Sequence, residues 1–230
     1  MDIIINGFKE ALRLILSLDP EVFEVVILSL KVSFLSLFIA VVLAIPLGIW
    51  LAKQQFCFKH ILMRLIYTWM GIPPVLCGLF VYILFMRRGP LGFLGLNYTV
   101  TVMIIAQILL IFPIVLGQTM NAIQNRQAKI LSLAKTLGAS SYQAFLLLLY
   151  ELRFEIGMAV VAGFSRAISE VGAVMIVGGN IEGKTRTMTT YISQLKGMGD
   201  FERAVAVGIV LLLISFVVNS LLYHFQKGDC

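Results

Sequence analysis

The chain has 230 residues, of which 60% are hydrophobic and 13% are charged, and its mean hydropathy is +0.96. Ordinary soluble domains have roughly 45–50% apolar and 25% charged residues, so this composition excludes a water-soluble globule and indicates one membrane-embedded domain. The net charge of +6 does not indicate nucleic-acid binding, because the 18 lysines and arginines are scattered among apolar runs rather than gathered on one basic face. The three cysteines, Cys57, Cys77 and Cys230, have no CxxC spacing and predict neither a disulfide framework nor a metal site.

The first segment differs from the apolar runs that follow it. Within residues 1–19, apolar side chains such as Ile5 and Phe8 alternate with Lys9 and Arg13, which predicts an amphipathic helix lying at the membrane interface. Residues 20–230 are predicted to form a single transmembrane domain. Its apolar runs predict five membrane-spanning helices, at residues 22–52, 65–86, 98–120, 156–177 and 204–223. The expected fold is therefore all-α, with five spans and one interfacial helix.

Residues 127–150, between the third and fourth predicted spans, have the pattern of a helical elbow. Apolar residues recur at helical spacing up to Ala134, Gly138 interrupts the pattern, and Ser140 to Gln143 has the S-x-x-Q spacing of a capping box. The sequence thus predicts a helix, a glycine turn and a second helix, meeting in a compact knob. Such a knob suits docking into a cleft of a partner protein, although an ordinary amphipathic connector fits the pattern equally well.

The fourth predicted span contains two charged residues, Arg166 and Glu170. Each charge costs at least about 2.5 kcal/mol at the centre of a helix that faces lipid, so both side chains are expected to face protein or water. Their spacing of four residues allows an ion pair on one helical face. Ser169 and Gly172 belong to a stripe of small residues that suits close helix packing. A pair that only locks helices together is therefore one interpretation.

The loop after this span matches the phosphate-loop pattern G-x-x-x-x-G-K-[ST] at residues 178–185. A true phosphate loop follows a strand, precedes a helix and needs an acidic residue at the end of another buried strand. The chain has only four aspartates, and none of them ends such a strand: Asp2, Asp19, Asp200 and Asp229. We interpret the match as a coincidence, and a membrane-bound phosphate-loop ATPase remains an alternative that nucleotide binding by the isolated chain would reveal.

Two stretches resemble a known family. The first, Ser132, Leu133, Ala134, Lys135, Thr136, Leu137, Gly138, Ala139 and Ser140, is similar to the EAA loop of binding-protein-dependent ABC import permeases. The second comprises residues 166–174, 178–181 and 185–190 and is similar to the tungstate permeases of that family, whereas molybdate and sulfate permeases carry looser versions. The resemblance covers the whole layout of the chain.

This resemblance implies a type I ABC importer permease fold, with a cytoplasmic coupling helix between spans 3 and 4 formed by the first stretch. It implies a homodimer in the cytoplasmic membrane of a prokaryote, two ATPase subunits on the cytoplasmic side, and an extracytoplasmic tungstate-binding protein. The chain itself would be no enzyme and would carry no catalytic residue, cofactor or metal. The N-terminus would lie outside and the C-terminus in the cytoplasm; the flanking lysines and arginines are evenly divided and do not choose an orientation.

The resemblance also implies roles for the polar residues of the second half. Arg166, Ser169, Glu170 and Gly172 would lie along or beside the path of a divalent oxyanion. Asn180, Lys184, Thr185 and Arg186 would form an outer mouth that receives the anion or docks the binding protein, although a solvated surface loop also fits these residues. The alternatives in function are a molybdate or sulfate ABC permease and a secondary transporter that uses Arg166 and Glu170 as a coupled charge pair. Secondary transporters often contain internal repeats, and none is visible in this sequence.

Overall fold

The computed structural model describes residues 2–17, 19–54 and 57–227; Met1, Leu18 and Cys230, which belong to the segments considered above, lie outside the described residues. Helices make up 83% of the described residues, and no strand occurs among them. The helices are α1 (Asp2–Ser17), α2 (Pro20–Lys53), α3 (Lys59–Met70), α4 (Pro74–Phe85), α5 (Val100–Thr136), α6 (Ser141–Glu151), α7 (Arg153–Ile168), α8 (Gly172–Gly178), α9 (Met188–Met198) and α10 (Phe201–Lys227), with one 3₁₀ turn, η1 (Gly92–Leu94). The predicted all-α class is confirmed.

Local signals start and stop the longest helices. The Asp19 carboxylate accepts hydrogen bonds from the first backbone N–H groups of α2, and Pro20 occupies the first turn, where its missing donor costs nothing. The Thr99 hydroxyl caps α5 in the same way. Helices α2, α5 and α10 are each long and apolar enough to cross a membrane without a break.

The second and fourth predicted spans are not single helices. Helices α3 and α4 meet at 97° across the break that contains Gly71 and Pro73, and α7 and α8 meet at 54° after Ile168. Pro73 and Pro74 have no backbone N–H to continue the hydrogen bonding of α3, so the chain ends one helix and starts another. The described residues therefore contain three unbroken spans, or five if each bent pair counts as one span.

The centre of the molecule is the packing of α2 against α5. Ala40 and Ala44 of α2 are fully buried against Leu116 and Met120 of α5 in the largest core cluster. Because small residues face large ones, the two helix backbones approach closely, which is how helices associate in the absence of water. Much of the remaining surface of these helices is apolar and exposed, as expected where lipid replaces water.

A polar contact crosses this core. The Ser36 hydroxyl of α2 lies 2.8 Å from Gln107 Oε1 of α5, and Gln107 Nε2 donates to the carbonyl oxygen of Ala167 in α7 at 3.1 Å. All three groups are buried. The contact fixes α7, and with it Arg166, relative to the two central helices.

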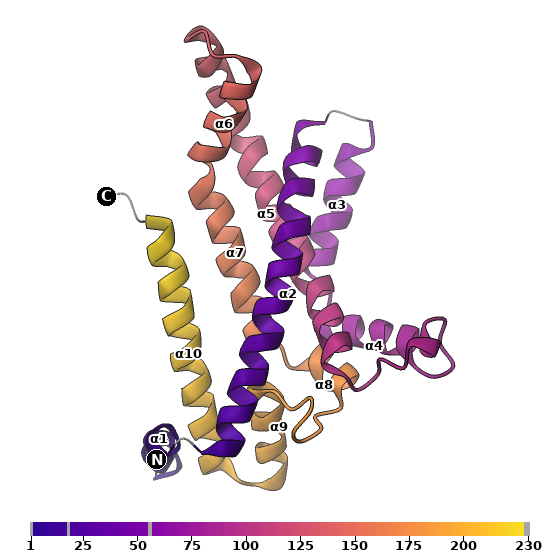
Figure 1. Ribbon diagram of the computed structural model, residues 1–230, viewed down its shortest axis with the longest axis vertical. Helices are drawn as coiled ribbons and strands as arrows, with labels where there is room; N and C mark the ends of the chain where they lie inside the picture. Colours follow the sequence, from indigo (N-terminus) through magenta and orange to yellow (C-terminus); the bar gives the residue numbers. More distant parts are fainter. Residues whose placement is uncertain (1, 18, 55–56, 228–230) are drawn as a thin grey trace.

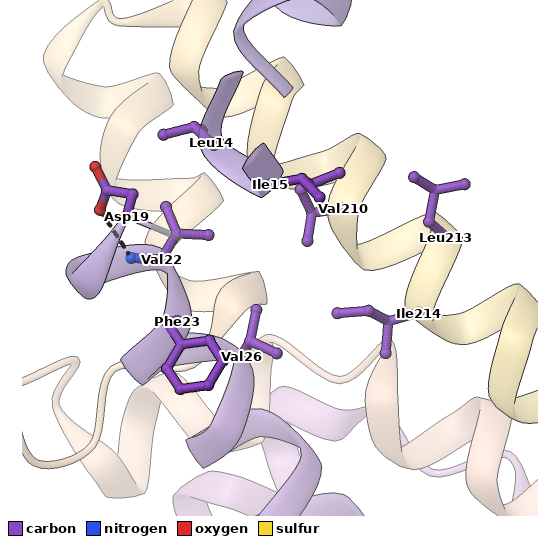
Figure 2. Close-up of a pocket in the computed structure, with 9 residues that line it drawn as sticks. All are labelled: Leu14, Ile15, Asp19, Val22, Phe23, Val26, Val210, Leu213 and Ile214. Carbon is purple, nitrogen blue, oxygen red and sulfur yellow. Dashed lines mark hydrogen bonds between the residues drawn. The ribbon is translucent and has the colours of Figure 1, made fainter. Parts of the chain in front are cut away.

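The molecule is elongated, and its two ends are built differently (Figure 1). Helix α6 and its turn form one end, whereas α1 and α9 lie at the opposite end, close to the starts of α2 and α10. There, α1 packs against α10, and an apolar groove of about 240 Å³ remains between α1, α2 and α10. Figure 2 shows that its lining is aliphatic or aromatic apart from Asp19, whose carboxylate points to the start of α2.

Candidate functional site

The elbow predicted at residues 127–150 is present, with one correction. The chain leaves α5 at Thr136, turns through Gly138, and starts α6 at Ser141. The Ser140 capping box with Gln143 is formed in both directions, as predicted. The first helix of the elbow is not a short element, however, because it is the last part of α5, which has 37 residues. Residues 121–136 are more polar than the third span but contain no proline or glycine, so the helix of that span continues into the elbow.

The turn itself has a defined backbone geometry. Gly138 has φ +77°, the left-handed region that favours glycine, and its N–H donates to the carbonyl oxygen of Lys135 at 3.0 Å. The Ala139 N–H donates to the carbonyl oxygen of Ala134, also at 3.0 Å. These two bonds together form a Schellman motif, which satisfies the last carbonyl groups of α5.

The elbow presents an apolar surface beyond the spans. Leu133, Leu137 and Tyr142 are 59%, 77% and 70% exposed, while Ala134 is buried. Of the nine predicted coupling residues, only Ala134 is buried, and Ala139 is intermediate. The base of the elbow is held by an ion pair of 2.9 Å between Arg126 and Glu155. A firmly supported knob with exposed apolar side chains is typical of a protein docking surface.

The predicted pair of Arg166 and Glu170 is formed, although not within one helix. Arg166 Nη2 lies 3.2 Å from Glu170 Oε2, but α7 ends at Ile168, so Glu170 lies in the break before α8. The Glu170 side chain is 2% exposed and the Arg166 side chain 32% exposed. A buried carboxylate needs further donors, and Glu170 Oε1 accepts one from the Ala173 N–H at 2.9 Å. The pair therefore joins the end of α7 to the start of α8.

Close backbone contact surrounds this break. A Cβ atom on Gly172 would lie 2.8 Å from Val75 of α4, and one on Gly78 would lie 2.6 Å from the Cα atom of Ala173. Helices α4 and α8 therefore approach to a distance that only glycine allows. The Ser169 hydroxyl is exposed and donates to the Ser165 carbonyl oxygen at 2.8 Å. All four residues predicted beside the path thus lie in one small region at the bend between α7 and α8.

The four residues predicted for an outer mouth fall into two groups. Asn180 and Lys184 are at least partly accessible, with Asn180 Nδ2 donating to Gln194 at 2.7 Å. Thr185 and Arg186 are buried. The Thr185 hydroxyl donates to the Gly178 carbonyl oxygen at 2.6 Å, so it closes the loop on itself. The exposed part of this segment is therefore residues 181–184.

An ion-pair cluster that the sequence analysis missed holds Arg186. Glu21 at the start of α2 lies 3.0 Å from both Arg186 and Arg203, and Arg186 also reaches Glu182 at 3.3 Å. Two effects raise the pKa of Tyr191 to about 12: burial, which is the larger, and a hydrogen bond to Glu21. The phenol is protonated at neutral pH and can donate a hydrogen bond. Glu21 and Arg186 are 165 residues apart, and no local sequence signal connects them.

The phosphate-loop pattern does not form a phosphate site. The helix α8 precedes it, in place of a strand. The N–H groups of Lys184, Thr185 and Arg186 all point to one acceptor, the carbonyl oxygen of Ile181, at 2.9–3.2 Å. Because a phosphate cradle needs these donors free, the alternative of a phosphate-loop ATPase is wrong.

The apolar spans, the exposed elbow and the charged bend between two half-helices define a membrane transport component. Residues 44–228 match the family of binding-protein-dependent transport system inner membrane components. The chain is 48% identical over 227 residues to the tungstate uptake system permease protein TupB of Peptoclostridium acidaminophilum, covering 99% of this chain and 100% of that relative. It is 36% identical to the protein of the same name from Campylobacter jejuni, covering 99% and 95%. The molybdenum transport system permease protein ModB of Escherichia coli is 29% identical, with 91% and 96% covered.

The chain therefore belongs to the family of binding-protein-dependent transport system inner membrane components, and it is a multi-pass membrane protein. The family resemblance inferred from the elbow and from residues 166–190 is confirmed. The relatives are permeases, the membrane components of transport systems, rather than enzymes.

Proposed function

We propose that this chain is the permease subunit of an ATP-driven importer of tungstate. The order of the identities carries the choice of substrate: two tungstate permeases match at 48% and 36% over almost the whole chain, against 29% for a molybdenum permease. Molybdate is the second candidate, because it shares the charge and the tetrahedral shape of tungstate, and sulfate is the third.

The fold supports the following proposed assembly. Two copies of this chain form the permease, each crossing the membrane five times when the bent pairs α3–α4 and α7–α8 count as one span each. The elbow end faces the cytoplasm and two ATPase subunits, and the end with α1 and α9 faces an extracytoplasmic binding protein. With the elbow on the cytoplasmic side, three crossings before it and two after it would give an N-terminus outside and a C-terminus in the cytoplasm of a prokaryote. Residues 1–19 lie at the interface and residues 20–230 form the permease domain, which contributes no catalytic residue and no cofactor.

Helix α5 supplies the mechanical link in this proposal. It is about 55 Å long at 1.5 Å per residue, and it runs from the elbow to the outer half of the molecule. The side chain of Gln107, about 44 Å from Thr136 along the axis, bonds to Ala167 next to the charged bend. Movement of the elbow by ATP binding therefore reaches Ala167, next to Arg166, through one continuous helix that contains Pro113 and through one buried hydrogen bond. Closing and parting of the two elbows opens the path outward and then inward.

At the bend, Arg166 is the group that meets the anion and Glu170 restrains it. The guanidinium is 32% exposed, whereas the carboxylate that pairs with it is 2% exposed. The buried carboxylate offsets part of the positive charge, so a divalent anion is attracted without being held too tightly to leave. Ser169 adds an exposed hydroxyl, Gly172 allows the close approach of α4, and the outer segment with Asn180, Lys184, Thr185 and Arg186 forms the mouth.

The first experiment is purification of the tagged chain from its native membrane in gentle detergent, followed by identification of the proteins that come with it. We expect an ATPase subunit whose turnover rises when binding protein and tungstate are added together. Absence of any ATPase would contradict the proposal and favour a secondary transporter that uses Arg166 and Glu170 as a charge pair.

A matched pair of variants sharpens this experiment. Leu137 at the elbow and Met198 at the opposite end are 77% and 70% exposed, so replacing either with alanine removes no core contact. We expect Leu137→Ala to reduce the recovery of the ATPase subunit, and Met198→Ala to leave it unchanged. Equal recovery with both variants would argue against the elbow as the docking site.

A further inference from the structure

We propose that the oxyanion released by the binding protein first binds the permease in a pocket on the outer part of α2, between Lys31 and Lys184. This inference rests on the proposed import of tungstate and adds the residue Lys31, which belongs to none of the sites described above. The pocket has a volume of about 230 Å³. It is lined by five residues of α2 and three of the outer segment: Glu24, Val25, Ile27, Leu28, Lys31, Gly183, Lys184 and Arg186. It brings three cationic side chains from two segments to one concave surface.

The position of Lys31 along α2 places it at the edge of the membrane. The uncharged stretch that follows it, residues 32–52, has 21 residues and a length of about 31 Å, close to the hydrocarbon thickness of a bilayer. Lys31 is therefore the first charge at the outer boundary, and the start of α2 projects beyond the membrane. A pocket at this level is open to water and leads directly towards the spans.

The Lys31 ammonium group is available to a ligand. Lys31 is exposed, and within the described residues it forms neither an ion pair nor a hydrogen bond. The same is true of the Lys184 side chain, which is exposed on the facing segment. An unpaired charge at the membrane boundary is costly unless it meets water or a ligand of opposite charge. Two such cations at one pocket favour a divalent anion.

The third cation has a different role. Arg186 is buried and already paired with Glu21 and Glu182, so it shapes the pocket wall and adds little free charge. Glu24 is the one acidic residue in the lining; it lies two helical turns from Lys31, towards the start of α2. A Cβ atom on Gly183 would lie 3.7 Å from Glu24 Oε1, so this carboxylate lies next to the outer segment on one side of the pocket. Its repulsion keeps anion affinity modest, which suits a site that passes its ligand on.

The dimensions also fit. A volume of about 230 Å³ is far above the roughly 10–15 Å³ that a cavity needs to hold one water molecule. A tetrahedral oxyanion and part of its hydration shell fill such a space. A phospholipid headgroup offers a similar phosphate group at this depth, so the test must separate the two sources.

The test uses the complete complex in lipid nanodiscs, with Ile27→Cys as a reporter. Ile27 lines the pocket and is 49% exposed, while the exposed Cys57 and the terminal Cys230 are replaced by serine and the buried Cys77 stays. The rate of reaction with a neutral thiol reagent is measured against increasing sodium tungstate. We expect tungstate to slow the reaction, and Lys31→Gln to raise the half-protecting concentration about tenfold, the order expected for one charge about 5 Å from a divalent anion in water.

Two further variants define the interpretation. Lys31→Arg keeps the charge and should retain protection, and Lys196→Gln removes an exposed cation from α9, outside the pocket, and should change nothing. The protection of the reporter cysteine could instead be independent of tungstate and increase with the fraction of phosphatidylglycerol in the discs. That result would assign the pocket to a lipid headgroup and overturn the proposal. Equal protection in wild type and Lys31→Gln would overturn it too.

Uptake of tungstate by the same wild-type complex in proteoliposomes separates this inference from the proposed function. If ATP-driven uptake occurs but tungstate does not protect the reporter, the proposed oxyanion pocket is wrong, whereas the proposed importer function is supported. If no uptake occurs, the importer is wrong, and the site for its substrate falls with it.

Discussion

The left-handed turn at Gly138 yields a prediction whose magnitude follows from its geometry. Gly138 has φ +77°, and a Cβ atom there would meet nothing within 4 Å, so a larger residue suffers backbone strain without any clash. That strain is roughly 1–2 kcal/mol for alanine, and it is smaller for asparagine, which visits this conformation more readily. A loss of this size shifts the equilibrium constant between the elbow conformer and its alternatives about 5- to 30-fold against the elbow.

The assay is the ATPase activity of the purified complex with binding protein and tungstate. We expect Gly138→Ala to lower the stimulation several-fold and Gly138→Asn to lower it less, although asparagine is the poorer helix former. Gly199→Ala is the matched control, because Gly199 also has positive φ and open space around it but lies at the other end of the molecule. Normal stimulation in Gly138→Ala, or an equal loss in Gly199→Ala, would refute the reasoning.

Substitutions at three further positions test the packing around the bend and the outer cluster, the first two by thermal unfolding in detergent and the third by hydrogen exchange. Glu170→Gln removes the ion pair with Arg166 but keeps the shape, and it should cost about 1–3 kcal/mol; a larger loss is expected for Glu170→Ala, which also frees the start of α8. Gly78→Ala places a methyl group against the backbone of Ala173, which should force α4 from α8 at a cost of about 1–3 kcal/mol, and an unchanged midpoint would contradict the close approach. Glu21→Gln leaves two buried or half-buried arginines without a full partner; faster hydrogen exchange in α9 is expected, and unchanged exchange would show that the cluster is not structural.

The elbow was predictable because its signals are local. The Ser140 capping box and the glycine before it lie within six residues, and each has one structural meaning. The pair of Arg166 and Glu170 followed from spacing alone, since two charges in an apolar span need each other. What spacing did not reveal is that the helix ends between them.

Two features of the fold went beyond what apolar runs can predict. A hydropathy pattern reports the length of an apolar run and not a bend within it. It therefore predicted α3 with α4, and α7 with α8, as single spans, although Gly71 and Pro73 are a visible signal for the first break. Helix α9 was interpreted as part of a loop because it is short and rich in threonine; its local signals were Thr187 at its start and Gly199 at its end.

The outer contacts depend on residues that are far apart in the chain. Glu21 meets Arg186 and Arg203 across 165 and 182 residues, and no pattern in one sequence connects them. Lys31 was not predicted as a site residue for a similar reason. In the sequence it is one of several charges before the uncharged stretch of α2, and only the fold brings it to the same pocket as Lys184.

The most direct test of the account is ATP-dependent accumulation of tungstate in proteoliposomes that contain this chain and its partner ATPase, with the binding protein supplied on the outer side. The account predicts accumulation that requires both ATP and the binding protein, with molybdate as the strongest competitor. Accumulation driven by an ion gradient without ATP, or none under any condition, would contradict it.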